Sequence, residues 1–247
     1  MIDFHQSLQI AKSAALLAGE FLLKSQGTDL KILLNQDRDL KLQLDIDTEN
    51  IIKDHILSHS SYSILGEETG SSDKLDECFW VVDPLDGTSN FLRGIPISCV
   101  SIALMHELKP VLGVIYDFNH DDLYFGHKES KAFMNDQEIQ VSKLSLKKES
   151  TLVTGIPAKT NYSDDEFNQL ILTFQSWKKI RMIGSAAMAA VYVAAGKAER
   201  YQENGIFLWD IAAGAAIVNA AGGIASISNL QPDYRVDAKF SNNQIEE

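Results

Sequence analysis

Two aspartates follow an apolar segment in the first half of the chain, and they constrain the fold more than any other feature. Residues 78–82 read Cys-Phe-Trp-Val-Val, and residues 83–91 continue as Asp-Pro-Leu-Asp-Gly-Thr-Ser-Asn-Phe. A short apolar run of this kind is typical of a buried strand. Ionised carboxylates at the end of such a strand are unfavourable unless a cation or a hydrogen-bond donor compensates their charge. Asp83 and Asp86 therefore predict a metal site.

The composition excludes several classes of function. With 247 residues, 45% of them hydrophobic and 23% charged, the chain is typical of a globular protein with a sizeable core. Its formal net charge of −12 offers no basic surface for nucleic acid or for an anionic membrane, so an anionic substrate would need the help of cations. No apolar run reaches the length of a membrane span, and Cys78 and Cys99 resemble reduced core thiols. We expect a cytoplasmic protein.

The first half of the chain predicts an α+β arrangement. Apolar and small residues recur at helical spacing between residues 4 and 25, and a second helix is expected to begin at Asp47 or Thr48. The polar segment 26–44 between them is expected to form a loop or a ribbon. Apolar runs then predict strands at residues 62–65, 78–82, 97–105, 111–116 and 123–125. Turn-forming residues at 107–110 favour an antiparallel connection.

The second half predicts an α/β arrangement. Strands are expected at residues 151–153, 179–182 and 199–201, and helices at 164–177, 185–195 and 209–221, with the last helix ended by two glycines. No linker rich in proline, glycine or serine separates the halves. We therefore expect one continuous unit over residues 1–247, made of an α+β half (1–142) and an α/β half (143–247).

Further carboxylates lie where a fold could direct them towards Asp83 and Asp86. Glu67 and Glu68 follow the predicted strand 62–65, and Asp210 begins the last predicted helix after a loop that contains residues 203–205. Oxygen ligands alone favour a hard cation such as Mg²⁺, which keeps several waters for substrate oxygens. Simpler explanations remain open, because Asp210 could cap its helix and the two glutamates could be solvated turn residues.

Two longer segments resemble the signature motifs of the inositol monophosphatase family. Residues 79–91 are similar to the first motif, and Trp-Asp-Ile-Ala-Ala-Gly at 209–214 with Ala-Ala-Gly-Gly at 220–223 is similar to the second. Gly-Glu-Glu at 66–68 matches the acidic turn that the family has before its first motif, and residues 181–187 resemble its substrate-side segment. Order and spacing agree over essentially the whole chain.

The resemblance implies a layered α-β-α-β-α sandwich of the inositol monophosphatase and fructose-1,6-bisphosphatase type. It also implies Mg²⁺-dependent hydrolysis of a phosphate monoester by in-line displacement at two cations about 3.5–4 Å apart. The first cation would bind Glu67, Asp83, the Leu85 carbonyl and Thr88, and the second would bind Asp83, Asp86 and Asp210. The nucleophile would be a water molecule between Thr88 and the first cation.

The resemblance also assigns the other site residues. Asp45 occupies the place of the acid that orients the Thr88 hydroxyl, with Asp47 as a competing choice, so that Thr88, Asp45 and Glu67 form the catalytic group. The substrate would be bound by Asp86, Gly87, Thr88, Ala186, Glu203 and Asp210. In this set, the backbone amides of Gly87 and Thr88 face the phosphate, and Glu203 contacts a sugar or inositol hydroxyl.

Inositol monophosphate, or a similar polyol or sugar phosphate, is the substrate that the resemblance favours. Related families hydrolyse 3'(2'),5'-bisphosphate nucleotides, histidinol phosphate or fructose 1,6-bisphosphate, and these substrates remain alternatives. A metal-binding regulatory protein without catalysis is an alternative of a different class. The family is commonly homodimeric, and related enzymes are often inhibited by Li⁺, so we expect both properties here.

One segment departs from the family pattern. The lysine commonly found in the loop before the second helix is replaced by Leu34, although Lys31, Arg38 or Lys41 could substitute for it. Whether a third, weaker cation binds through this loop therefore stays open.

Overall fold

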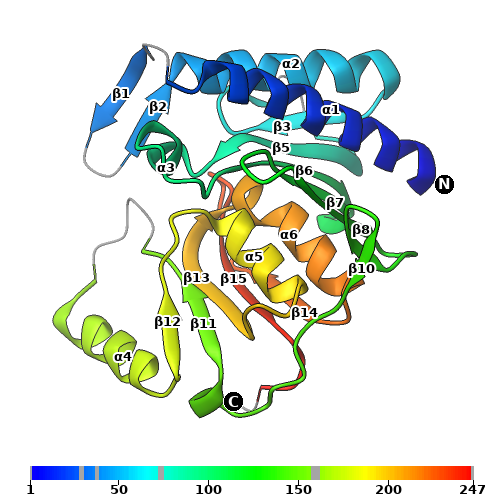
Figure 1. Ribbon diagram of the computed structural model, residues 1–247. Helices are drawn as coiled ribbons and strands as arrows, with labels where there is room; N and C mark the ends of the chain where they lie inside the picture. Colours follow the sequence, from blue (N-terminus) through cyan, green and yellow to red (C-terminus); the bar gives the residue numbers. More distant parts are fainter. Residues whose placement is uncertain (1, 28–30, 37–38, 72–74, 157–161, 246–247) are drawn as a thin grey trace.

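The structure, a computed structural model, describes residues 2–27, 31–36, 39–71, 75–156 and 162–245, and for residues 34–36 and 39–41 the backbone alone. Helices and sheets alternate in layers (Figure 1). Helices α1 (Phe4–Ser25) and α2 (Gln43–His59) cover one face of a large sheet, and helices α5 (Ala186–Ala194) and α6 (Leu208–Ala220) cover its other face. A second sheet and the outer helix α4 (Asp164–Gln175) complete the α-β-α-β-α order.

The first layer contains the two helices expected near the N-terminus. Helix α1 has the predicted bounds, and the Asp3 carboxylate caps it by accepting a hydrogen bond from the Gln6 amide at 2.9 Å. Helix α2 begins at Gln43, earlier than the predicted start at Asp47 or Thr48. The reason is local, because the Asp45 carboxylate accepts a hydrogen bond from the Leu42 amide at 2.8 Å and so caps the earlier turn.

The large sheet has eight strands in the order β10-β9-β8-β7-β6-β5-β3-β4, and only the β3–β5 pair is parallel. The strands are β3 (Ser63–Gly66), β4 (Gly70–Ser71), β5 (Cys78–Asp86), β6 (Cys99–His106), β7 (Lys109–Asp117), β8 (Asp122–His127), β9 (Ala132–Met134) and β10 (Gln137–Ile139). The antiparallel β6–β7 connection was predicted. Strands β4, β9 and β10 were not, because they are short and contain no long apolar run.

Strand β5 continues through the two aspartates instead of ending before them. Its pairing with β6 shifts between Asp83 and Asp86, where Pro84 lacks the amide hydrogen that a regular ladder needs. The strand is followed by Gly87 and the short helix α3 (Thr88–Leu92). The bulge therefore places both carboxylates at the end of the sheet.

The second sheet has the order β12-β11-β13-β15-β14, with β11 parallel to both of its neighbours. Its strands are β11 (Thr151–Thr154), β12 (Lys179–Arg181), β13 (Arg200–Phe207), β14 (Ile224–Ser228) and β15 (Arg235–Ser241). The expected loop at residues 203–205 is in fact part of β13. The strand was not recognised at these residues because their side chains are polar. Its backbone pairing with β15 does not require apolar residues. Strands β14 and β15 were not predicted for the same reason.

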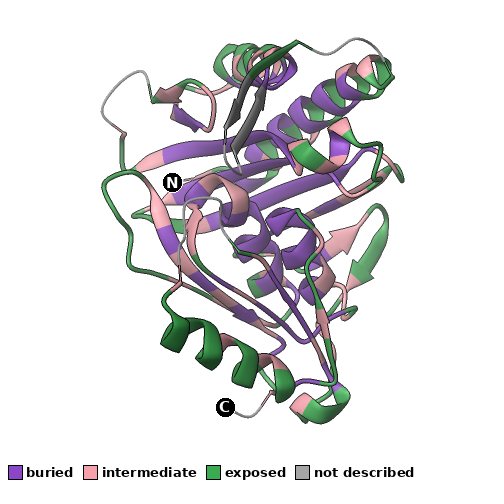
Figure 2. Cartoon of the chain, turned by 90° about the vertical axis from the view of Figure 1, so that its left-hand side faces the viewer, coloured by how far each residue is buried: buried purple, intermediate pink, exposed green. Residues whose placement is uncertain are grey.

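Small residues let helices α5 and α6 fit between the two sheets. An added Cβ at Gly113 of β7 would lie 2.8 Å from the carbonyl carbon of Ala213 in α6, so the helix and the sheet approach closely there. One hydrophobic cluster includes Val81 from the large sheet, Ala190 from α5 and Phe240 from the second sheet. Figure 2 shows the buried residues gathered in this central region, whereas α4 is exposed along its length.

Two smaller features complete the described chain. The segment expected to be a loop or a ribbon contains the antiparallel pair β1 (Ile32–Gln36) and β2 (Asp39–Leu42), which confirms a ribbon. A 3₁₀ helix, η1 (Lys147–Glu149), precedes β11. Among the described helices, none combines the length and apolar character needed to cross a membrane.

Candidate active site

Three carboxylates meet where β3, β5 and α6 come together. Carboxylate oxygens of Glu67, Asp83 and Asp210 lie within 4.8 Å of one another. Asp83 is 1% exposed, and within the described part of the chain no hydrogen-bond donor reaches its buried Oδ2. Burial and the neighbouring carboxylates raise the pKa of Asp83 and of Asp210 well above their usual range. An oxygen-lined cluster in which the buried Asp83 Oδ2 accepts no hydrogen bond from the described residues fits a hard divalent cation.

The backbone next to these acids is fixed by the first motif. The Leu85 amide donates to Asp83 Oδ1 at 3.0 Å, and the Thr88 hydroxyl donates to the Leu85 carbonyl at 3.0 Å. Gly87 has a φ of +90°, and a Cβ on it would lie 2.8 Å from the Ile97 carbonyl oxygen. Because this conformation and this contact both exclude a side chain, the turn requires glycine.

Asp86 is held from the opposite side of the cleft. Its Oδ2 accepts hydrogen bonds from the Ser185 hydroxyl at 2.6 Å and from the Ala187 amide at 2.7 Å. Burial raises the pKa of Asp86 to about 6, and these hydrogen bonds act against that rise. Ser185 also caps α5, because its oxygen accepts a hydrogen bond from the Met188 amide at 3.2 Å. From the sequence, Ser185 was included in the substrate-side segment 181–187 and in a helix, but no role was assigned to its side chain.

Asn90 fastens the first motif to the segment before α5. Its side-chain amide donates to the carbonyls of Ile97 and Ile183, both at 2.8 Å. The two carbonyls come from different halves of the sequence, so one side chain joins both sides of the cleft.

Helix α2 supports the site from its first turns. Asp45 is buried and Asp47 is exposed, where it accepts a hydrogen bond from the Gln43 side chain at 2.9 Å. Asp210 likewise caps its own helix by accepting from the Phe207 amide at 3.2 Å, so a capping role and a place in the acidic cluster coexist. That Asp45 orients Thr88 stays a prediction.

Glu49 is a further residue that sequence reasoning missed. It is fully buried, and its carboxylate accepts hydrogen bonds from the backbone amides of Glu68 at 2.8 Å and Thr69 at 3.1 Å. These contacts hold the acidic turn that carries Glu67. The signal was a charged residue one helical turn from Asp45 on the buried face of a helix.

A cleft of about 450 Å³ opens beside the carboxylates. Its polar lining includes Asp86, Ser185, Glu203 and Asp210, and its wall includes Thr154, Gly155, Ile156, Met182, Ala186 and Ile206. None of the described residues that line it is a lysine, an arginine or a histidine. Glu203 is 8% exposed, and burial raises its pKa to about 7. The cleft therefore brings together Ala186, Glu203, Asp86 and Asp210, and that they bind the substrate stays a prediction.

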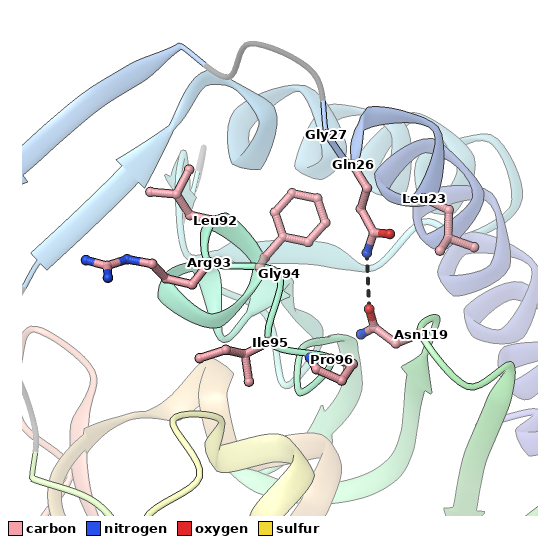
Figure 3. A pocket seen from close by; sticks show the side chains of 10 residues that line it. Leu23, Gln26, Gly27, Leu92, Arg93, Gly94, Ile95, Pro96 and Asn119 are labelled. Atoms are coloured by element: carbon pink, nitrogen blue, oxygen red, sulfur yellow. Dashed lines mark hydrogen bonds between the residues drawn. The ribbon is translucent and has the colours of Figure 1, made fainter.

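A second cavity, of about 750 Å³, lies between the end of α1 and the loop after α3. Gln26 donates a hydrogen bond to Asn119 beside it at 3.1 Å (Figure 3). Its described lining contains Arg93 but no carboxylate, so it does not resemble a cation site.

The loop considered for a third cation is only partly described. Lys31 is exposed, the side chains of Leu34 and Lys41 are not described, and Arg38 lies outside the described residues.

Comparisons with known proteins agree with this architecture. Residues 3–240 match the model of the inositol monophosphatase family. Inositol monophosphatase 2 from Saccharomyces cerevisiae is 38% identical over 75% of this chain and 68% of its own length, and Nus factor SuhB from Pasteurella multocida is 36% identical over 92% and 87%. The structure of an inositol monophosphatase from Anabaena superposes with a TM-score of 0.83 at 32% identity, over 98% of this chain and 92% of that one.

The family match over residues 3–240 includes strands of both sheets and every element that lines the cleft. The layered sandwich is thus the fold of these relatives, and the predicted fold is confirmed. The chain belongs to the inositol monophosphatase family and is a phosphoric monoester hydrolase.

Proposed function

We propose that this phosphatase uses Mg²⁺ to hydrolyse inositol monophosphate or a similar polyol phosphate. The observation that carries the proposal is the cluster of Glu67, Asp83 and Asp210, whose oxygens lie within 4.8 Å of one another beside the cleft. Mutual repulsion of buried carboxylates is unfavourable without a cation. A bound cation also reduces the repulsion between an acidic cleft and an anionic phosphate.

The proposed metal ligands are the ones that the family resemblance assigns. They are Glu67, Asp83, the Leu85 carbonyl and Thr88 for one cation, and Asp83, Asp86 and Asp210 for the other. When bound, two such cations supply Lewis-acid activation of water and stabilise the leaving alkoxide. Asp86 is suited to this role because Ser185 and the Ala187 amide occupy only its Oδ2.

The protein's own groups position the reactants. Thr88 is fixed by its hydrogen bond to the Leu85 carbonyl, and we assign its hydroxyl, together with Glu67 and the buried Asp45, to orienting the attacking water. The backbone amides of Gly87 and Thr88 are assigned to the phosphate, since a glycine there allows close approach of the chain. Orientation of reactants is a large part of enzymatic phosphoryl transfer.

The cleft supports a substrate with one phosphate and a neutral, hydroxylated remainder. Glu203 provides an acceptor for a hydroxyl, and Ala186 keeps the neighbouring wall small. A second phosphate finds no cationic side chain among the described lining residues. This argues against bisphosphate nucleotides and fructose 1,6-bisphosphate. Histidinol phosphate has no free hydroxyl to offer to Glu203, because its one alcohol group carries the phosphate.

A panel of phosphate monoesters assayed with Mg²⁺ tests the proposal. We expect inositol 1-phosphate and related polyol phosphates to be hydrolysed with the highest kcat/KM, and Li⁺ to inhibit the reaction. Turnover of a 3',5'-bisphosphate nucleotide far above that of inositol phosphate would overturn the substrate assignment. Absence of Mg²⁺-dependent phosphate release from every ester in the panel would instead favour a metal-binding regulatory protein.

We further propose that the protein is a homodimer. Helix α4 has no buried residue, and Phe167, Ile171 and Leu172 on it are 49%, 37% and 58% exposed. A second copy of the chain would remove this apolar surface from water. Sedimentation equilibrium should give twice the monomer mass, and Phe167→Ser should weaken association, whereas the control Leu57→Ser on α2 should not. A monomeric wild type would refute this.

A further inference from the structure

The carboxylate of Glu203 is held on one oxygen only. The Tyr201 hydroxyl donates a hydrogen bond to Glu203 Oε2 at 3.1 Å. Its other oxygen, Oε1, accepts no hydrogen bond from the residues that the structure describes, although Glu203 lines the substrate cleft. One oxygen is thus engaged by the protein and the other is available to a ligand.

Tyr201 is itself rigidly placed. It lies two residues before Glu203 on β13, and residues at this spacing share one face of a strand. Its ring is 1% exposed and packs against Phe240 with a centroid separation of 5.6 Å. A ring fixed by packing defines where its hydroxyl lies, so the carboxylate bound to it is also restricted.

Gly155 restricts the same carboxylate from the neighbouring strand. It directly follows β11, which pairs with β13, and a Cβ on it would lie 2.8 Å from Glu203 Cδ. The carboxylate therefore occupies the space that a side chain at position 155 would need. Glu203 is confined between a tyrosine hydroxyl and a glycine backbone.

We propose that Tyr201 is a positioning residue for substrate selection, whose hydroxyl holds Oε2 of Glu203 and leaves Oε1 to accept a hydrogen bond from a hydroxyl of the substrate alcohol. This inference rests on the proposed function and adds Tyr201 to the groups that select the substrate. The favoured phosphate esters carry a free hydroxyl group in addition to the phosphate. Glu203 repels an alcohol that carries a second negatively charged group. The Tyr201 hydrogen bond also acts against the burial that raises the pKa of Glu203, which favours the ionised acceptor.

Steady-state kinetics of Tyr201→Phe on two substrates tests the inference. The first substrate is inositol 1-phosphate, and the second is phenyl phosphate, which has no hydroxyl to offer. With inositol 1-phosphate we expect KM to rise about 10-fold and kcat to stay within about 2-fold, as for loss of a hydrogen bond to a charged group. With phenyl phosphate we expect neither constant to change beyond about 2-fold.

Tyr124→Phe is the matched control, because Tyr124 is also 1% exposed and does not line the cleft. It should leave both constants unchanged for both substrates. If Tyr201→Phe fails to fold, Gly155→Ala provides the second variant, since its methyl group displaces the same carboxylate and should give the same selective rise in KM.

The possible outcomes separate this inference from the proposed function. Suppose that the wild type hydrolyses inositol 1-phosphate. If Tyr201→Phe then leaves the KM for inositol 1-phosphate unchanged, or raises the KM for inositol 1-phosphate and for phenyl phosphate equally, the inference is overturned and the proposed function survives. If the wild type hydrolyses phenyl phosphate but no polyol phosphate, the proposed substrate class and the inference both fail.

Discussion

The two sides of the cleft differ in burial and in charge. On the metal side, Asp83 and Asp86 are 1% and 8% exposed, and hydrogen bonds from several elements hold them. On the substrate wall, Ile156 and Met182 are 36% and 51% exposed and make no polar contact with the acids. Under the proposed function, the metal side determines the reaction, because buried charge allows few alternatives. The exposed part of the wall is expected to tolerate change.

Removal of one buried carboxylate should have the largest effect. Asp83→Asn should lower kcat/KM by about 10³-fold, a loss typical of removing a preorganised electrostatic group. Because the substitution also removes an unfavourable buried charge, thermal stability without Mg²⁺ should not decrease. Thermal melts and phosphate release measure the two effects. Asp47→Asn, at an exposed position, is the control, and equal losses in the two variants would contradict the contrast between buried and exposed acids.

Metal removal should make stability depend on pH. Burial raises the pKa of Asp86 from its ordinary 3.8 to about 6, so the folded state binds this proton more tightly than the unfolded state. Below pH 4, the tighter binding of this proton stabilises the folded state by about 3 kcal/mol, and this stabilisation is lost as pH rises through about 6. In a chelator, the melting temperature of the wild type relative to Asp86→Asn should therefore fall over this range, and Mg²⁺ should restore it. A difference in melting temperature between the wild type and Asp86→Asn that does not change with pH would refute the unfavourable burial assigned to Asp86.

Loss of Ser185, which orients Asp86 and caps α5, should have a smaller effect. Ser185→Ala removes the 2.6 Å hydrogen bond to Asp86 Oδ2 while the Ala187 amide remains. We expect kcat to fall about 10-fold, because hydrogen bonds to charged groups contribute about 1.5–3 kcal/mol. Kinetics should be compared with Ser163→Ala, which removes the cap of α4 away from the cleft. An unchanged kcat in Ser185→Ala would show that the Ala187 amide suffices.

The exposed part of the wall, at Ile156 and Met182, should be the least sensitive region. Met182→Ala should change KM for inositol 1-phosphate by about 2-fold or less and leave kcat unaltered, since substitutions at exposed positions usually have effects within about 0.5 kcal/mol. Steady-state kinetics measure this change. A loss comparable to that of Asp83→Asn would show that the wall participates in the chemistry.

The sequence predicted the acidic cluster better than the elements that support it. Strand ends and helix starts carry Glu67, Asp83 and Asp210, and their clustering followed from the family resemblance. Glu49 was missed, and Ser185 was included in the segment 181–187 without a role, because each is an ordinary helix or cap residue until tertiary contacts bring it to the acids. The strand predicted at 199–201 in fact continues through Glu203, and that continuation was mistaken for a loop because its side chains are polar. The division of the chain at residue 142 stays a prediction.

The central claim is that a bound divalent cation makes the acidic cluster a phosphatase site. Its most direct test is phosphate release from inositol 1-phosphate by the wild type, first with excess chelator and then during titration with Mg²⁺. The account predicts no turnover in the chelator and a saturable return of activity as Mg²⁺ is added. Undiminished hydrolysis in the chelator, or no hydrolysis at any Mg²⁺ concentration, would contradict it.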